Sequence, residues 1–239
     1  PQPVTRNSLR RLKIMGKELA IVLVSGGMDS CVVAAIANQE YDMAFLHVNY
    51  GQLTEKRELG AFKEIANYYG VKKNRQLITN IGYLLKIGGS SLTDQNIEIN
   101  NGDLNGNRVA NTYVPFRNTH LLSIAVSWAE VISAGYIFIG AVSQDNPGYP
   151  DCKEEYYEAF NNLIKVGTKP DTCIKVVTPV IGLQKSEIVK RGVSLNAPLH
   201  LTWSCYKNNF HACGKCNSCL LRIEAFRKAD IIDYVRYAI

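Results

Sequence analysis

Residues 22–30 constrain the fold more than any other stretch, and they read Val-Leu-Val-Ser-Gly-Gly-Met-Asp-Ser. An apolar segment of strand length runs into a Ser-Gly-Gly turn and then into an acidic, hydroxyl-bearing start of a helix. Gly26 and Gly27 permit positive φ and close backbone approach, so several N–H groups can point at one anion beside the positive end of the helix. The pattern predicts a phosphate cradle and a nucleotide-dependent enzyme, with an ordinary glycine-rich turn as the alternative.

The spacing of this turn distinguishes it from two common phosphate-binding loops. The chain has no Gly-x-x-x-x-Gly-Lys-Ser/Thr and no Gly-x-Gly-x-x-Gly after a strand. Ser-Gly-Gly-x-Asp-Ser instead resembles the PP-loop of the ATP pyrophosphatases, which bind the pyrophosphate of ATP and transfer its adenylyl group. Asp29 is expected to orient the loop or the hydration shell of Mg²⁺, and a helix cap is the alternative role. The candidate nucleotide-binding residues are Val24, Ser25, Gly26, Gly27, Met28, Asp29 and Ser30.

Composition narrows the class of protein further. The 239 residues carry a formal net charge of +6, which suits an anionic ligand such as ATP but is too diffuse to indicate nucleic-acid binding. No stretch approaches eighteen uncharged apolar residues, so a soluble, cytoplasmic protein is expected. Residues 1–16 are basic and proline-flanked at their start, and we interpret them as a flexible extension, either processed, continued upstream or non-native.

Strand-length apolar runs alternate with helical patterns along most of the chain. This order predicts a doubly wound parallel sheet of the Rossmann-like α/β class, with the ligand site at the carboxyl ends of its strands. Strands are predicted at residues 19–24, 43–48, 75–78, 136–139 and 174–177, and helices at residues 29–38, 55–69, 117–134, about 153–166 and 186–191.

The domain organisation follows from the same pattern. Residues 17–200 are predicted to form the α/β domain, and residues 201–239 a metal-binding and helical segment packed on it. Residues 88–111 are rich in Asn, Gly, Ser and Asp, which favours a loop. This loop is interpreted as either a lid over the site or a passive surface insertion.

Four of the seven cysteines gather near the C-terminal end in a C-x7-C-x2-C-x2-C pattern: Cys205, Cys213, Cys216 and Cys219. Such spacing favours one structural zinc ion per chain, with all four positions filled by protein. An iron–sulfur centre, or His211 in place of one sulfur, is the alternative. Of the other cysteines, Cys31 and Cys173 are predicted to be buried. Cys152 lies in a loop on the predicted active face and could be a nucleophile, but a pocket-wall or packing role is predicted for it.

With both motifs placed, the chain resembles the 7-cyano-7-deazaguanine synthase family of PP-loop enzymes, which serves queuosine biosynthesis. The resemblance runs from about residue 19 to residue 222. Besides residues 25–30, it is carried by His-Val-Asn-Tyr-Gly-Gln at 47–52, Val-Pro-Phe-Arg-Asn at 114–118, Gly-Tyr-Pro-Asp-Cys at 148–152, Thr-Trp-Ser-Cys-Tyr at 202–206 and the cysteine cluster.

The resemblance implies a ligase that forms C–N bonds, using ATP, Mg²⁺ and ammonia to convert 7-carboxy-7-deazaguanine into 7-cyano-7-deazaguanine. It also implies a homodimer. Nucleic acid is not required for this activity. A tRNA-modifying PP-loop enzyme with a related core, or a module that binds ATP without chemistry, is the alternative.

Site roles can be assigned beyond the loop. Ser25, Asp29, Arg117 and Lys185 are the candidate catalytic residues. Arg117, Tyr149 and Asp151 are the candidate substrate-binding residues. The alternatives are a surface ion pair for Arg117, a solvated side chain for Lys185 and a loop cap for Asp151. His47 is interpreted as a packed histidine with satisfied hydrogen bonds.

Overall fold

A computed structural model describes residues 16–94, 96–99, 109–143 and 149–238. Five parallel strands form one sheet with the order β3-β2-β1-β4-β5. This is the doubly wound order, in which the direction of winding reverses between β1 and β4. The strands are β1 (Leu19–Leu23), β2 (Asp42–Asn49), β3 (Gln76–Asn80), β4 (Tyr136–Phe138) and β5 (Lys175–Val177).

The central strand shows why the sheet is buried on both faces. Alternate residues of a strand point to opposite faces, and those of β1 divide between two cores. Ala20 and Val22 pack on one face, while Ile21 and Leu23 pack on the other. A continuous apolar run is therefore what a parallel central strand requires.

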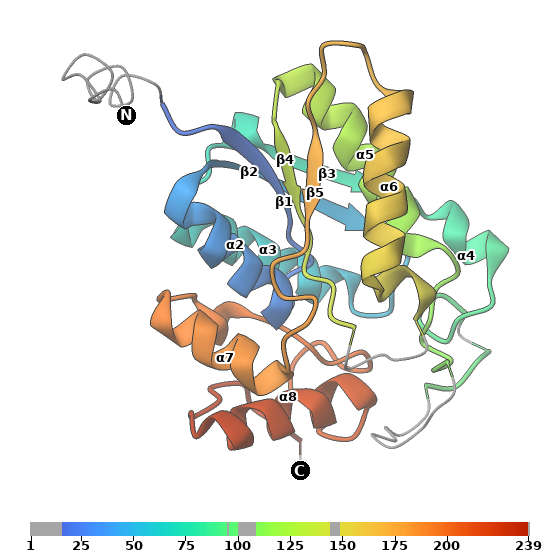
Figure 1. Ribbon diagram of the computed structural model, residues 1–239. Helices are drawn as coiled ribbons and strands as arrows, with labels where there is room; N and C mark the ends of the chain where they lie inside the picture. The colour runs from blue at the N-terminus through green and yellow to red at the C-terminus, as the bar shows by residue number, and fades with distance from the viewer. Residues whose placement is uncertain (1–15, 95, 100–108, 144–148, 239) are drawn as a thin grey trace.

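Helices cover both faces of the sheet (Figure 1). One core is formed with α2 (Met28–Glu40), α3 (Glu55–Tyr68), α7 (Lys185–Ser194) and α8 (Asn217–Ala229), and the other with α5 (Arg117–Ile132) and α6 (Glu154–Gly167). The short α4 (Tyr83–Ile87) follows β3. α7 and α8 pack against each other below the carboxyl ends of the strands in Figure 1.

Most predicted elements agree with the structure to within a few residues. α7 begins one residue earlier than predicted, where Gln184 and Glu187 form a capping box, and it ends three residues later than predicted. α4 was not predicted. In residues 88–111, the described part contains turns but no helix or strand, and its Leu92 and Ile99 are buried; residues 95 and 100–108 of the predicted loop lie outside the described residues.

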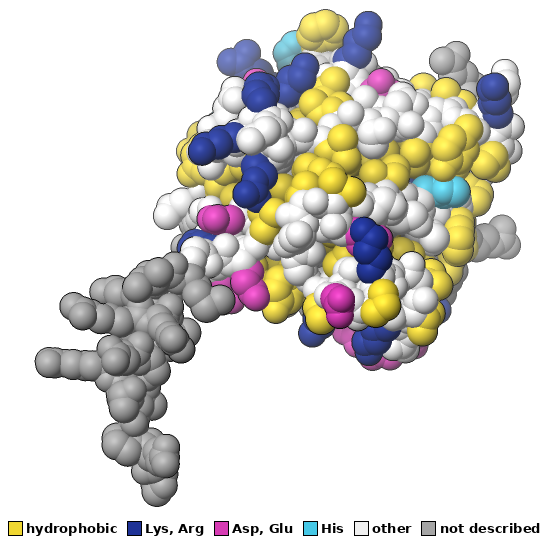
Figure 2. Space-filling model, turned by 90° about the horizontal axis from the view of Figure 1, so that it is seen from above, with side chains coloured by type: hydrophobic (Ala, Val, Ile, Leu, Met, Phe, Trp, Pro, Cys, Tyr) yellow, Lys and Arg dark blue, Asp and Glu magenta, His cyan; other side chains and the backbone are white. Residues whose placement is uncertain are grey.

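Two observations describe the helices and one face of the molecule. No helix in the described ranges is long and apolar enough to cross a membrane. The face at the amino ends of the strands carries Lys and Arg side chains that are separated by hydrophobic and uncharged ones (Figure 2).

Candidate active site

The Ser-Gly-Gly turn joins β1 to α2 at the carboxyl edge of the sheet, as the sequence predicted. The Gly27 N–H donates to Ser25 Oγ at 3.2 Å, and Ser30 Oγ donates to the Gly27 carbonyl at 2.9 Å. Ser25 Oγ and Ser30 Oγ lie 3.2 Å apart. These bonds fix the turn, while the first backbone N–H groups of α2 have no partner within the helix and point out of its end. The arrangement is one that suits an anion.

Of the two glycines in the turn, Gly26 adopts the positive φ that glycine permits and Gly27 does not. Gly26 has φ +93°, and a Cβ there would lie 2.5 Å from the Glu58 carbonyl oxygen of α3. Gly27 has φ −82° and is the extended residue that precedes α2. Gly26 is required by backbone conformation and by close packing.

Gly140, which follows β4, is a second close approach, and the sequence analysis did not single it out. A Cβ at Gly140 would lie 2.9 Å from the Ser30 backbone nitrogen. The end of β4 therefore packs directly against the first turn of α2. Only a residue without a side chain leaves these two backbones in contact.

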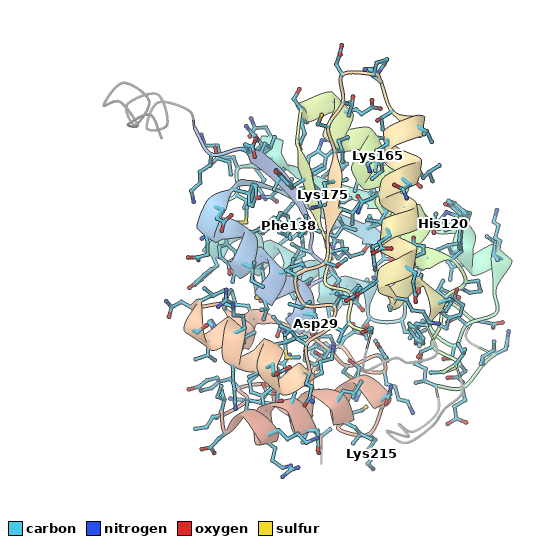
Figure 3. All side chains as sticks on the ribbon, in the orientation of Figure 1. Asp29, His120, Phe138, Lys165, Lys175 and Lys215 are labelled. Carbon is cyan, nitrogen blue, oxygen red and sulfur yellow. The ribbon has the colours of Figure 1, made fainter. Side chains whose placement is uncertain are left out.

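Asp29 and Lys185 form an ion pair at this edge of the sheet. Lys185 Nζ lies 2.6 Å from Asp29 Oδ2, and the two side chains are 14 % and 26 % exposed. Both alternatives from the sequence are wrong: Asp29 makes no side-chain cap at α2, and Lys185 is not a solvated lysine. Figure 3 shows Asp29 at the carboxyl end of the sheet near α7. Its Oδ1 is buried and has no hydrogen-bond partner among the described residues.

Arg117 lies in the wall of the same pocket, at the start of α5. Its guanidinium sits 5.5 Å from the centre of the Tyr50 ring and donates to Tyr50 Oη at 3.4 Å. Its Nε is buried without a hydrogen-bond partner in the described part of the chain. Arg117 is therefore not part of a surface ion pair. A buried guanidinium with an unused donor suits an anionic ligand.

The phenols around this guanidinium are neutral near pH 7. Burial raises the pKa of Tyr50 to about 12, although the Arg117 charge opposes the shift. Burial also raises the pKa values of Tyr149 and Tyr206. Burial alone would lower the pKa of Arg117, but Tyr50 and Asp151 outweigh it and the pKa is raised. This part of the pocket wall thus holds the Arg117 charge beside neutral hydroxyl groups.

The Tyr-Pro-Asp-Cys segment forms the wall next to Arg117. Tyr149 Oη is hydrogen-bonded to Thr112 Oγ1 at 2.7 Å, and both residues line the pocket. Asp151 is buried behind this wall, where Oδ2 accepts the Asn118 backbone N–H at 3.2 Å. The carboxylate therefore caps the first turn of α5, and its contact with substrate stays a prediction.

Cys152 lines the pocket as a packing residue. Burial, reinforced by the Asp151 charge, raises the pKa of its thiol to about 11. The thiolate fraction at neutral pH is then very small, which disfavours the nucleophile alternative.

Several pocket residues were not identified from the sequence because they come from the C-terminal segment. That segment contacts the PP-loop, where the Trp203 N–H donates to the Gly26 carbonyl, and it lines one side of the pocket. Its contribution consists of Trp203, Ser204, Tyr206, Ser218, Leu221 and Arg222. The only sequence signal was that Trp203, Ser204 and Tyr206 flank Cys205 in one of the motifs.

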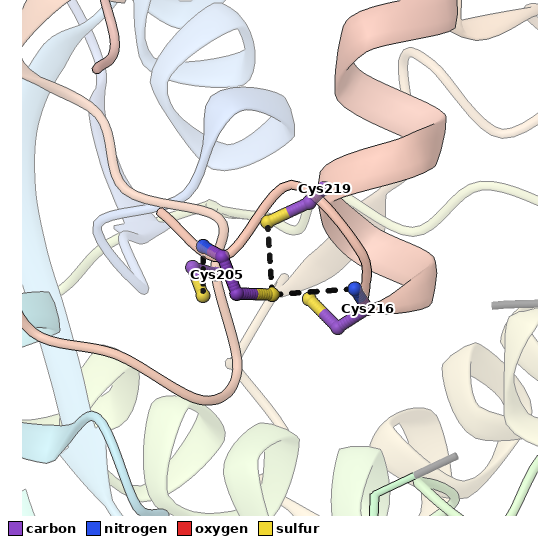
Figure 4. Close-up of side chains that lie close together, drawn as sticks. Cys205, Cys216 and Cys219 are labelled. Atoms are coloured by element: carbon purple, nitrogen blue, oxygen red, sulfur yellow. Dashed lines mark hydrogen bonds between the residues drawn. The ribbon is translucent and has the colours of Figure 1, made fainter. Parts of the chain in front are cut away.

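The four clustered cysteines converge as the spacing predicted. The sulfur atoms of Cys205, Cys213, Cys216 and Cys219 all lie within 4.8 Å of one another. Figure 4 shows three of these side chains pointing toward one another. A tetrahedral zinc with Zn–S bonds of about 2.3 Å places its sulfurs about 3.8 Å apart, and Cys213 Sγ and Cys219 Sγ are 3.9 Å apart. The donor set fits one metal ion.

Backbone hydrogen bonds support this thiolate set. Cys205 Sγ accepts N–H groups from Lys207, Asn208 and Cys213 at 3.3 to 3.4 Å. Cys213 Sγ accepts N–H groups from Lys215 and Cys216 at 3.4 and 3.3 Å. Such bonds stabilise negative charge on sulfur, the form that binds metal.

Of the predictions for the remaining histidines and cysteines, some are confirmed and one is wrong. His211 is exposed and is not a member of the cluster. Cys31 is buried as expected. Cys173 is exposed, so the prediction that it is buried is wrong, because it lies in the connection before β5 and not in the strand. His47 is packed as interpreted, with ring nitrogens 2.9 Å from the Val24 carbonyl oxygen and from Asn49 Oδ1.

Arg222 of α8 fastens the C-terminal segment to the pocket. Its Nε and one terminal nitrogen donate to the two carboxylate oxygens of Asp233 at 2.8 and 2.9 Å. Its other terminal nitrogen donates to Thr202 Oγ1 at 2.7 Å and to Ser204 Oγ at 3.2 Å. The Arg222 side chain is 2 % exposed. One guanidinium thus joins α8, the segment before Cys205 and the C-terminal residues.

Asp233→Asn is expected to lower the free energy of unfolding by about 2 kcal/mol at pH 7. That is below the usual cost of breaking a buried pair, because Arg222 keeps its hydroxyl acceptors. Burial would raise the Asp233 pKa, but hydrogen bonds from Arg222 outweigh it and the pKa is lowered. Its contribution is therefore complete above the unfolded pKa of about 3.9 and is lost as pH falls through the lower folded value. Urea unfolding of both proteins at pH 7 and below pH 4 measures this, and a constant difference would contradict it.

The comparisons with known proteins agree with this geometry. A model of the family described as queuosine biosynthesis protein QueC matches residues 19–230. A protein from Chlorobium phaeobacteroides named 7-cyano-7-deazaguanine synthase is 53 % identical over 91 % of this chain and 96 % of its own length. A protein of the same name from Chloroherpeton thalassium is 53 % identical over 92 % of this chain and 97 % of its own.

Solved structures are more distant. The U34-tRNA thiolase NcsA from Methanococcus maripaludis aligns with a TM-score of 0.49 and 16 % identity, over 90 % of this chain and 65 % of that one. This likeness is too weak to carry an argument. The family model matches most of the chain, and relatives that are about half identical to it align over nearly its whole length. The chain therefore belongs to the QueC family of queuosine biosynthesis proteins.

Proposed function

We propose that this protein converts 7-carboxy-7-deazaguanine and ammonia into 7-cyano-7-deazaguanine at the expense of ATP. The observation that carries the proposal is one pocket in which the PP-loop and the buried, unpaired Arg117 Nε face the same space. The first site binds pyrophosphate, and the second suits an anionic group. The names of the relatives support this activity, and they do not favour a macromolecular substrate.

The reaction begins when the substrate carboxylate attacks the α-phosphorus of ATP, and pyrophosphate leaves toward the PP-loop. Ammonia then displaces AMP from the acyl adenylate and gives an amide. A second ATP activates the amide oxygen in the same way with release of pyrophosphate, and loss of AMP and of both nitrogen-bound protons leaves the nitrile. Backbone N–H groups at α2 and the Lys185 ammonium stabilise the charge that develops on the departing pyrophosphate.

Asp29 is the residue of this site that would hold Mg²⁺. Its Oδ2 pairs with Lys185, while its buried Oδ1 has no partner among the described residues. A carboxylate oxygen is a preferred Mg²⁺ ligand, and a bound Mg²⁺ would neutralise phosphate charge. Lys185 holds the carboxylate in place on its other side.

Zinc is the metal proposed for the four cysteines. Four sulfur ligands leave no open position for substrate, so the ion would be structural. Separations below 4.8 Å suit a single ion, whereas in an iron–sulfur cluster the thiolates bind different iron atoms and lie farther apart. Metal analysis is expected to find about one zinc per chain, and a visible iron chromophore would contradict this assignment.

One reaction tests the proposed function. The zinc-loaded protein is incubated with 7-carboxy-7-deazaguanine, ammonium, ATP and Mg²⁺, and the products are analysed by mass spectrometry. The nitrile is expected, with two AMP formed for each nitrile. Absence of both amide and nitrile from folded, zinc-loaded protein would reject the proposal.

Arg117→Lys is expected to lower kcat/KM by about 10- to 100-fold, which corresponds to the loss of a charged hydrogen bond. Lysine keeps the charge but loses the planar fork and the stack on Tyr50. A rise in KM for the deazapurine with unchanged KM for ATP would assign Arg117 to the substrate carboxylate, and the reverse would assign it to phosphate.

Tyr50→Phe is the matched control, because it removes the hydroxyl that Arg117 contacts and keeps the aromatic ring. A change of less than tenfold is expected for this variant. Equal losses in both variants would indicate that the pocket wall, not the guanidinium, determines the effect.

The expected setting is the cytoplasm, and the expected assembly is a homodimer. The homodimer rests on the family resemblance, and the cytoplasmic setting rests on the composition of the sequence. Light scattering on the purified protein measures the assembly, and a monomer at micromolar concentration would contradict it.

A further inference from the structure

We propose that Trp203 is a positioning residue that couples the four-cysteine metal centre to nucleotide binding at the PP-loop. Trp203 lies two residues before Cys205, is 4 % exposed and lines the pocket. The inference rests on the proposed function, since it requires ATP at the PP-loop. It gives the metal centre a role beyond holding the C-terminal segment in place.

The backbone of Trp203 contacts the PP-loop directly. Its N–H donates to the Gly26 carbonyl at 2.9 Å. Its carbonyl oxygen lies 3.6 Å from the position that a Cβ would take at Gly27. Gly26 is bounded by the Glu58 carbonyl of α3 as well. The position of this turn therefore depends on the position of Trp203.

The indole of Trp203 contacts the metal-binding loop. Its Nε1–H is shared between the carbonyl oxygens of Cys205 and Asn208, each at 3.1 Å. The Asn208 N–H in turn donates to Cys205 Sγ at 3.4 Å. The Arg57 guanidinium of α3 lies 4.8 Å from the centre of the ring. The indole is held between α3 and the loop that carries the first metal-binding sulfur.

These contacts form one continuous path from the Cys205 sulfur, through Trp203, to the PP-loop. When Cys205 is bound to metal, the loop holds both carbonyls where the indole N–H can reach them. Loss of the metal frees that loop, so the buried N–H loses its fixed acceptors and Trp203 no longer fixes the Gly26 carbonyl. Binding at two coupled sites is reciprocal. Bound ATP should therefore retain the metal, just as bound metal should strengthen ATP binding.

Trp203 is also a reporter, because Trp128 is the only other tryptophan. Trp128 is half-buried on α5 and packs in a different hydrophobic cluster from Trp203, so Trp128→Phe leaves Trp203 as the single indole. ATP with Mg²⁺ is titrated into this zinc-loaded variant while Trp203 emission is followed. The rate at which zinc passes to a coloured chelator is then measured with and without saturating ATP.

Saturating ATP is expected to shift Trp203 emission and to slow zinc transfer by at least about fivefold, the lower end of usual coupling. Trp203→Phe is measured beside Trp128→Phe, because it keeps an aromatic ring over Arg57 but removes the N–H. We expect this variant to bind ATP more weakly and to lose zinc at a rate that ATP no longer changes.

Two results would overturn the inference while the proposed function stands. One is ATP binding to the Trp128→Phe protein with no change in the zinc transfer rate. The other is a Trp203→Phe protein whose zinc transfer still responds fully to ATP. Failure of ATP to bind any of these proteins would overturn the proposed function and this inference together.

Discussion

Gly26→Ala is expected to lower kcat/KM for ATP by about 10²-fold or more while the sheet stays folded. Two independent effects act on this position. Alanine disfavours the backbone φ of +93°, and its Cβ would lie 2.5 Å from the Glu58 carbonyl oxygen. The turn must then move away from α3, and the N–H groups at the start of α2 move with it. Such a displacement misaligns these N–H donors with the charge that develops on the departing pyrophosphate.

Gly70→Ala separates these two effects. Gly70 also has a positive φ, +64°, but nothing lies within 4 Å of the Cβ position. Both variants are expected to lose about 1–2 kcal/mol of stability from the strained backbone, and only Gly26→Ala should lose ATP turnover. Steady-state kinetics and thermal unfolding of the pair measure this. Equal activity in the two variants would mean that close packing against Glu58 does not position the loop.

The sequence predicted the parts of this site that are local in the chain. Residues 25–30 form the turn and the start of a helix at the carboxyl edge of the sheet because glycine conformation, hydroxyl groups and helix polarity act within six residues. The sheet followed from alternating apolar segments. The four cysteines converged because two of their spacings are those of a tight turn around one metal ion.

Contacts between distant segments were not predictable in the same way. The position of Asp29 at the start of a helix allowed a helix cap as its alternative role. In the structure its carboxylate instead accepts a hydrogen bond from Lys185, which lies 156 residues later in the chain. Trp203, Tyr206 and Arg222 line the pocket because α8 packs on α7 and the C-terminal segment contacts the PP-loop. Nothing in their local spacing indicates that packing.

Gly140 shows the same limit for a backbone contact. Its sequence context indicates only that a strand ends there. The need for glycine comes from the Ser30 backbone, which lies more than a hundred positions earlier in the chain. A single sequence does not reveal which backbones approach each other.

Cys216→Ser is expected to reduce bound zinc well below one per chain and to lower the melting temperature by about 10 °C or more. Metal binding at such a site is coupled to folding, and a loss of about 3–5 kcal/mol corresponds to that shift in a chain of this size. Cys216 is fully buried at the start of α8, so its sulfur anchors the helix that carries Arg222. Metal analysis and calorimetry measure the two effects.

Cys173→Ser is the matched control, because this thiol is exposed and lies outside the cluster. It should keep its zinc and melt within about 1–2 °C of the unchanged protein, as surface substitutions usually do. A Cys216→Ser protein that retains one tightly bound zinc would remove Cys216 from the ligand set. A protein that loses zinc yet melts normally would show that the pocket wall formed by Trp203 and Arg222 stands without the metal, which would also contradict coupling through Trp203.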